Sequence, residues 1–199
     1  MISHQHKLLF YHIPRTAGTT LELLFINMDW AYVDLSTKHP SMENFKKIYE
    51  EFWMDYQKIS IVRNPFSWVK STYTDKTSPN QNFEDYCLNF NLDYGVNDSG
   101  IKYCDIKGST FTEILGNNMD EIYHFEFITG NKFSTIKKEY NLSKHTPKSM
   151  VYENHNKTLK PLHTSKTIEI IRHKFKDDFI NFYPNFLNYD NNTLINMFN

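Results

Sequence analysis

Residues 7–25 read KLLFYHIPRTAGTTLELLF, and this stretch decides how the rest of the chain is interpreted. Its short apolar run, Leu8–Tyr11, predicts a buried strand because it is brief, rich in aromatic residues and soon ended by a proline. A turn of small residues follows, and Leu21, Leu24 and Phe25 then recur at the spacing of one buried helix face. The stretch therefore predicts a strand, a tight turn and the start of a helix.

The turn at residues 14–20 has the composition of an anion-binding loop. The first turn of a helix leaves its N–H groups unpaired, and the helix dipole adds partial positive charge there. Gly18 lets the backbone come close to a ligand, the threonine hydroxyls add donors, and Arg15 adds a permanent cation. Small-residue turns are also common structural connections between a strand and a helix, so this alternative stands beside the phosphate cradle.

The composition bounds the class of protein. A length of 199 residues suits one α/β domain, residues 1–199, with a sizeable core. Hydrophobic content of 40% and aromatic content of 16% indicate a packed globule. A net charge of −1 argues against a nucleic-acid partner. The stretch 131–176 holds eleven Lys or Arg against three acidic residues, which fits either a solvated basic face or an anion-binding surface.

The cysteines and the apolar runs predict the cellular compartment of the protein. Cys87 and Cys104 have neither CxxC nor zinc-like spacing, so we expect reduced thiols. No apolar run approaches the ~20 residues of a membrane span, and no signal-peptide pattern opens the chain. We therefore expect a cytoplasmic protein with no membrane span, and nothing in the sequence indicates its oligomeric state.

Strands and helices alternate along the chain. Strands are predicted at residues 8–11, 31–35, 58–62 and 121–126. Helices are predicted after an N-cap at Ser41, from Pro65, from Asn82 to Phe90, and at residues 133–140 and 165–182, with long loops at 92–110 and 141–163. This alternation predicts an α/β fold with a central, mainly parallel sheet flanked by helices. The turns after the first three strands should then meet at the carboxyl edge of the sheet, where ligands of such folds bind.

Two motifs, HIPRTAGTT at residues 12–20 and KISIVRNPFSWVKSTY at residues 58–73, resemble the paired signatures of sulfotransferases that use 3′-phosphoadenosine-5′-phosphosulfate (PAPS). The narrower similarity is to the carbohydrate branch, with the heparan sulfate 2-O- and 6-O-sulfotransferases and small bacterial relatives. In that family the first motif binds the 5′-phosphosulfate, and the Arg and later Ser of the second bind the 3′-phosphate. The resemblance implies a three-layer, P-loop-like sulfotransferase fold and these donor-binding residues: Arg15, Thr16, Ala17, Gly18, Thr19, Thr20, Arg63 and Ser71.

Two weaker matches extend the likeness. KHPSMENFKKI, residues 38–48, resembles the family's His-led segment and implies that His39 is the catalytic base, where the alternative is an exposed turn histidine. ENHNKTLK, residues 153–160, is similar to the family's late His-x-Asn-Lys loop and implies donor contacts from Asn156 and Lys157, unless it is a plain basic loop. One departure is Arg15, because the heparan sulfate branch has Lys there while other branches use Arg.

The implied reaction moves a sulfuryl group from PAPS to a hydroxyl acceptor, a glycan or small molecule rather than a protein. Negative charge develops on the leaving phosphate oxygen, and a cation such as Arg15 stabilises it without a metal. The acceptor hydroxyl needs a base with a pKa near neutrality, which suits His39. Glu22 is a second candidate for this base, although an acidic residue early in a helix also complements the dipole.

Two alternative functions stay open at this point. A P-loop kinase or other NTPase also begins with strand, loop and helix, but its signature G-x-x-x-x-G-K-[ST] requires a Lys that this turn lacks. A noncatalytic nucleotide-binding relative is the other alternative, and the presence of both Arg15 and His39 argues against it.

Overall fold

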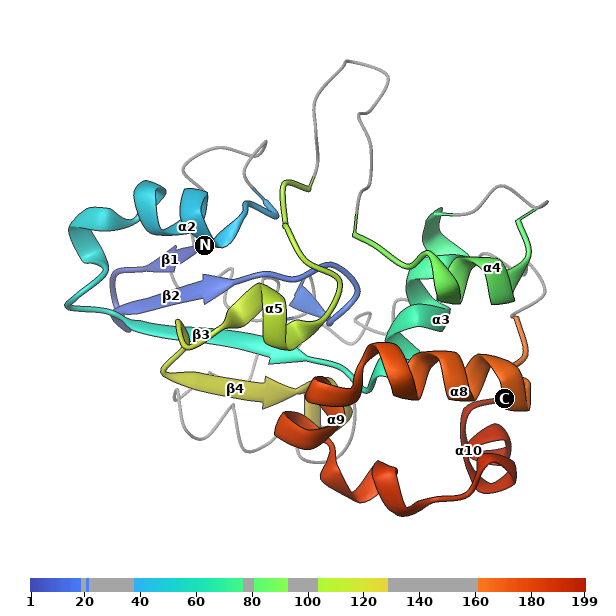
Figure 1. Ribbon diagram of the computed structural model, residues 1–199. Coiled ribbons are helices and arrows are strands. Elements are labelled where there is room, and N and C mark those ends of the chain that lie inside the picture. Colours follow the sequence, from blue (N-terminus) through green and yellow to red (C-terminus); the bar gives the residue numbers. More distant parts are fainter. Residues whose placement is uncertain (19–20, 22–37, 77–80, 93–103, 129–160) are drawn as a thin grey trace, which may run out of the picture.

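The computed structural model describes residues 1–18, 21, 38–76, 81–92, 104–128 and 161–199, and a four-stranded sheet lies at its centre (Figure 1). The strands follow one another across the sheet in chain order: β1 (Ile2–Ser3), β2 (Leu8–Tyr11), β3 (Gln57–Val62) and β4 (Glu121–His124). β1 pairs antiparallel with β2, whereas β2, β3 and β4 run parallel. The prediction of an α/β fold with a mainly parallel sheet is confirmed.

The register of the sheet brings two predicted motifs to one edge. Every residue of β2 and the last four residues of β3 are buried, which explains their continuous apolar sequences. Tyr11, the last residue of β2, pairs with Ser60, two residues before β3 ends at Val62. The Ser60 hydroxyl also donates a hydrogen bond of 2.8 Å to the Tyr11 carbonyl. The segments that follow β2 and β3 therefore leave the sheet side by side.

The predicted helix starts are confirmed at three places. Ser41 caps α2 (Met42–Ile48) by accepting a hydrogen bond of 3.2 Å from the Asn44 N–H. Asn82 caps α4 (Phe83–Leu88) in the same way. α3 (Pro65–Lys76) begins with its proline, whose missing N–H would have no partner in a first turn. The regular helix after Ser41 ends at Ile48, and the chain then tightens into a 3₁₀ turn, η2 (Glu50–Phe52).

Other boundaries differ from the predictions. β4 stops at His124, and the chain turns into α6 (Phe125–Ile128), where the alternating pattern predicted strand as far as Glu126. The predicted helix 165–182 is two helices, α8 (Ser165–Lys174) and α9 (Lys176–Phe182), joined at the fully buried Phe175. Four further short elements were not predicted: β1, α5 (Phe111–Leu115), the 3₁₀ turn η3 (Pro184–Asn188) and α10 (Asn191–Phe198).

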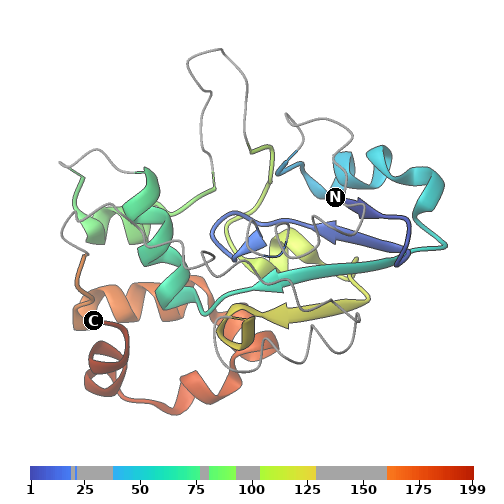
Figure 2. The same ribbon diagram turned by 180° about the vertical axis from the view of Figure 1, so that it is seen from behind.

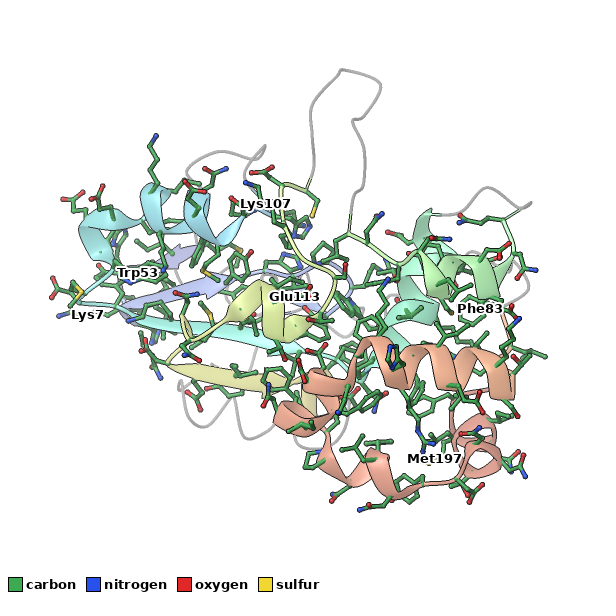
Figure 3. The ribbon with its side chains drawn as sticks, in the orientation of Figure 1. Lys7, Trp53, Phe83, Lys107, Glu113 and Met197 are labelled. Atoms are coloured by element: carbon green, nitrogen blue, oxygen red, sulfur yellow. The ribbon has the colours of Figure 1, made fainter. Side chains whose placement is uncertain are left out.

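Helices gather beyond the carboxyl ends of the strands. α3, α4, α8 and α10 lie there in both views, while α5 covers one face of the sheet (Figures 1 and 2). Trp68 of α3 is fully buried among them, with its ring 4.0 Å from that of Phe111 and 5.1 Å from that of Phe90, centroid to centroid. Side chains from α4 and α8 fill the space between these helices, with Phe83 labelled on α4 (Figure 3). Trp68 is therefore a core residue.

The predicted strand at 31–35, the predicted helix at 133–140 and most of the loop at 141–163 lie outside the described residues. Among the helices that the structure does describe, none is long and apolar enough to cross a membrane.

Candidate functional site

The loop that follows β2 is held by a hydrogen bond from α3 and by another within the loop itself. The indole Nε1 of Trp68 donates a hydrogen bond of 2.9 Å to the Pro14 carbonyl. The hydroxyl of Thr16, which is fully buried, donates one of 2.8 Å to the carbonyl of Ile13. Because this proton is engaged within the loop, any hydrogen bond that Thr16 donates to an anion must come from its backbone N–H. The loop conformation is therefore set by the protein itself.

The loop backbone has the form expected of an anion-binding nest. Arg15 and Ala17 both have φ of +66°, a left-handed conformation that costs a non-glycine residue about 1 kcal/mol or more. Such alternation makes successive N–H groups converge on one side of the chain. A helical turn begins directly after it, with the Leu21 N–H donating a hydrogen bond of 3.0 Å to the Ala17 carbonyl. The predicted strand, turn and helix start are thus confirmed.

Gly18 stands where no side chain fits. A Cβ built on Gly18 would lie 1.9 Å from Cδ2 of the His12 imidazole, which is buried beneath it. The glycine is therefore required for the packing of the loop on His12.

The side chain of Arg15 joins the first motif to the second. Its Nε donates a hydrogen bond of 3.1 Å to the hydroxyl of Ser71, and its Nη1 lies 3.0 Å from Oδ1 of Asp75. Ser71 and Asp75 are four residues apart on α3 and so lie on the same helix face. Two residues predicted to bind opposite ends of one nucleotide, Arg15 and Ser71, are therefore in direct contact.

Arg63 holds the loop from the end of β3. Its Nη1 donates a hydrogen bond of 3.0 Å to the Arg15 carbonyl, its Nε donates one of 3.0 Å to the Ser67 hydroxyl, and its guanidinium lies 4.1 Å from the centroid of the Phe125 ring. Burial lowers the pKa of Arg63 to about 10, and the charge of Glu126 acts in the opposite direction. The guanidinium is therefore charged at neutral pH and fixed in one orientation.

Glu126 links the second motif to the C-terminal helices. One carboxylate oxygen accepts a hydrogen bond of 2.8 Å from the Asn64 N–H, and the other accepts one of 2.9 Å from the Tyr183 hydroxyl. Burial and the nearby Glu126 carboxylate raise the pKa of Tyr183 well above its usual range, so this hydroxyl keeps its proton. Glu126, a residue of α6, thus anchors the turn that follows β3.

His39 lies beside the start of the loop. The Tyr11 hydroxyl donates a hydrogen bond of 2.9 Å to the Pro40 carbonyl, and the Asp105 N–H donates one of 2.8 Å to the His39 carbonyl. The ring Nδ1 of His39 lies 2.9 Å from the His12 carbonyl oxygen. A carbonyl only accepts hydrogen bonds, so Nδ1 of His39 carries a proton, and in the neutral ring the lone pair lies on Nε2. In this tautomer Nε2 is the basic atom of the ring.

The structure thus gathers most of the predicted site residues at the carboxyl edge of the sheet. Arg15, Ala17 and Gly18 lie in the loop, Arg63 and Ser71 reach it from β3 and α3, and His39 approaches through His12. The other predicted site residues lie outside the described residues: Thr19, Thr20, Glu22, Asn156 and Lys157.

Four contacting residues were missed by the sequence analysis: Ser67, Asp75, Glu126 and Tyr183. Ser67 and Asp75 stand four residues after Arg63 and Ser71, and this i, i+4 spacing on a predicted helix was a usable signal. Within the described parts of the chain, no group of three or more His, Cys, Asp or Glu side chains is placed to hold a metal ion.

Comparison with known proteins gives one family. The model of the sulfotransferase family matches residues 1–129, which include β1–β4, both motifs and Glu126. No match was found among curated proteins or among solved structures. With the family model covering well over half of the sequence, and with both motifs meeting at one edge of an α/β sheet, this chain belongs to the sulfotransferase family.

Proposed function

We propose that this sulfotransferase takes its sulfuryl group from PAPS and transfers it to a hydroxyl group of a carbohydrate. The observation that carries the proposal is the contact between the two motifs, in which Nη1 of Arg63 lies 3.0 Å from the Arg15 carbonyl oxygen. A nucleotide with anions at both its 5′ and 3′ positions needs two cationic sites within one short reach. Arg15 and Arg63 supply them from adjacent strand ends.

The residues at the loop fit the phosphosulfate end of this donor. The left-handed residues Arg15 and Ala17 turn N–H groups toward one side, and Arg15 adds a guanidinium from the same loop. PAPS, when bound, supplies an activated sulfuryl group on a good leaving phosphate. The role of Arg15 is to stabilise negative charge as it develops on that leaving group.

Arg63 and Ser71 fit the 3′-phosphate end. Arg63 is held by Ser67, Phe125 and the Arg15 carbonyl, so little side-chain entropy is lost when it binds an anion. The hydroxyl of Ser71 accepts a hydrogen bond from Arg15 and still has its own proton to donate to a phosphate oxygen.

His39 is the proposed base for the acceptor hydroxyl. Its Nδ1 donates a hydrogen bond to the His12 carbonyl, and we assign Nε2, the basic atom of that tautomer, to take the acceptor's proton as the hydroxyl attacks. A carbohydrate acceptor is proposed from the resemblance of the two motifs to the carbohydrate branch.

The test is a transfer assay with ³⁵S-labelled PAPS and a panel of heparan-type glycans, other oligosaccharides, lipids and small alcohols. The proposal expects labelled product with at least one oligosaccharide and at least about 10²-fold less with His39→Ala under the same conditions. Label on lipids or small alcohols alone would overturn the carbohydrate assignment. Tight binding of the desulfated nucleotide with no transfer to any acceptor would favour a noncatalytic relative.

A further inference from the structure

Asp75 places a negative charge inside the proposed anion site. Its Oδ1 lies 3.0 Å from Nη1 of Arg15, on the same face of α3 as Ser71. Neither the anion-binding loop nor the family resemblance predicts an acidic residue at this position. A carboxylate beside Arg15 opposes the binding of a doubly charged ligand, because like charges at close range repel. Its position therefore needs an explanation.

The ion pair is of a kind that exchanges readily. The side chain of Arg15 is 28% exposed and that of Asp75 is 39% exposed, so water screens their attraction. Arg63, by contrast, is enclosed by Ser67, Phe125 and a backbone carbonyl. Phosphate and sulfate oxygens accept bidentate hydrogen bonds from a guanidinium and bind it more strongly than one carboxylate oxygen does. A phosphosulfate group would thus displace Asp75, whereas a weaker ligand would not.

We propose that Asp75 is a specificity-determining residue of the donor site, a built-in counter-ion that the 5′ anion of the nucleotide must replace on Arg15. This inference rests on the proposed function, since it takes Arg15 as the ligand of the 5′ end. Asp75 therefore lowers the affinity for every nucleotide that engages Arg15 and leaves unchanged the affinity for one that does not. It also takes back Arg15 as the desulfated product leaves, which speeds product release.

Calorimetry with two nucleotides tests this exchange. Adenosine 3′,5′-bisphosphate carries both anions, and adenosine 3′-monophosphate lacks the one that Arg15 binds. Because an exposed ion pair contributes little, we expect Asp75→Asn and Asp75→Ala to bind the bisphosphate about two- to fivefold more tightly than the wild type. The affinity for the monophosphate should stay the same in both variants. Equal or weaker binding of the bisphosphate by both variants would overturn the exchange.

Two controls separate exchange from a general effect of charge. Asp55→Asn removes one negative charge at an exposed position near the other end of β3, and we expect it to leave both affinities unchanged. In an Arg15→Ala background, Asp75→Asn should no longer improve binding, since the pair to be broken is already gone. An improvement that persists without Arg15 would also contradict the proposal.

The outcomes distinguish this inference from the proposed function. If the wild type binds the bisphosphate and the Asp75 variants bind it no better, only the exchange fails. If neither the wild type nor any variant binds it, the donor assignment fails and the exchange with it. Binding that is detectable only after Asp75→Asn would support both.

Discussion

Nη1 of Arg63 donates a hydrogen bond of 3.0 Å to the backbone carbonyl of Arg15, so a side chain of the second motif holds the backbone of the first. Arg15 in turn reaches Ser71, eight residues after Arg63. Arg15 and Arg63 are 48 residues apart in the sequence, yet each motif fixes part of the other. Substitutions in either motif should therefore affect a single site.

Arg15→Ala should lower turnover while the protein stays folded. The side chain is partly exposed and its contacts are with Ser71 and Asp75, so little core packing is lost. By analogy with other charge-stabilising donors, we expect turnover to fall by roughly 10²–10³. Steady-state transfer rates with saturating donor measure this. Arg15→Lys keeps the charge but not the fork and should recover part of the loss. Full activity in Arg15→Ala would exclude Arg15 from the reaction.

His39→Ala should separate binding from transfer. The imidazole contacts the His12 carbonyl rather than the proposed nucleotide ligands, so we expect the affinity for adenosine 3′,5′-bisphosphate to stay within about twofold. Turnover should fall by roughly 10²–10⁴ because the acceptor hydroxyl loses its base. His4→Ala, at an exposed histidine that contacts Tyr56, is the matched control and should keep full turnover. Retained transfer by His39→Ala would move the base to another residue.

Glu126→Ala should destabilise the fold through the turn after β3. The substitution removes the acceptor of the Asn64 N–H and of the Tyr183 hydroxyl, and both residues are buried. A buried donor left without its partner costs about 1–3 kcal/mol in the free energy of unfolding. Urea denaturation of Glu126→Ala measures this. Glu51→Ala, at an exposed position in η2, should change stability by less than about 0.5 kcal/mol. Equal effects of the two substitutions would show that Glu126 does not anchor the turn.

The stability of the protein should fall in mild acid because of His163. Its ring is 3% exposed and lies edge-on to Phe66, Phe83 and Phe198. Burial lowers the pKa of His163 from 6.5 to about 4, with Lys70 acting in the same direction and the Phe66 backbone against it. Between these two values the unfolded chain binds a proton that the folded chain does not, so the free energy of unfolding decreases as the pH falls.

This loss of stability is absent above the ordinary histidine pKa of 6.5, and it is complete below the pKa of about 4 that His163 has in the folded protein. It amounts to about 3 kcal/mol across the window. Urea denaturation at a series of pH values from 7 to 4 should show it in the wild type, and His163→Phe should remove this part of the slope. The same pH dependence in both proteins would mean that His163 titrates normally in the fold.

Sequence reasoning reached the parts of the site that local chemistry determines. The buried strands Leu8–Tyr11 and Gln57–Val62, the cap at Ser41 and the loop around Gly18 follow from apolar runs and turn residues. The positions of Arg15 and Arg63 at neighbouring strand ends follow from a parallel sheet, whose carboxyl ends meet.

Contacts between residues far apart in the chain could not be predicted from the sequence, for physical reasons. The alternation in residues 121–126 gave no sign that the strand ends at His124, since Phe125 and Glu126 turn away to reach Arg63 and Asn64. Phe175 continues a helical apolar pattern, yet the chain changes direction there because its buried ring packs among Trp68 and Phe90. The ion pair of Arg15 with Asp75 depends on how a left-handed residue directs its side chain, which no periodicity encodes.

The central claim is that Arg15 and Arg63 bind the two anionic ends of one nucleotide. Calorimetric titration of wild type and Arg63→Ala with adenosine 3′,5′-bisphosphate tests it most directly, with Lys47→Ala as a control for the loss of an exposed positive charge and circular dichroism to confirm the fold. We predict micromolar binding by the wild type and by Lys47→Ala, and binding weaker by about 10–100-fold in Arg63→Ala, as the loss of a hydrogen bond to a charged group implies. Unchanged affinity in a folded Arg63→Ala protein would contradict the account.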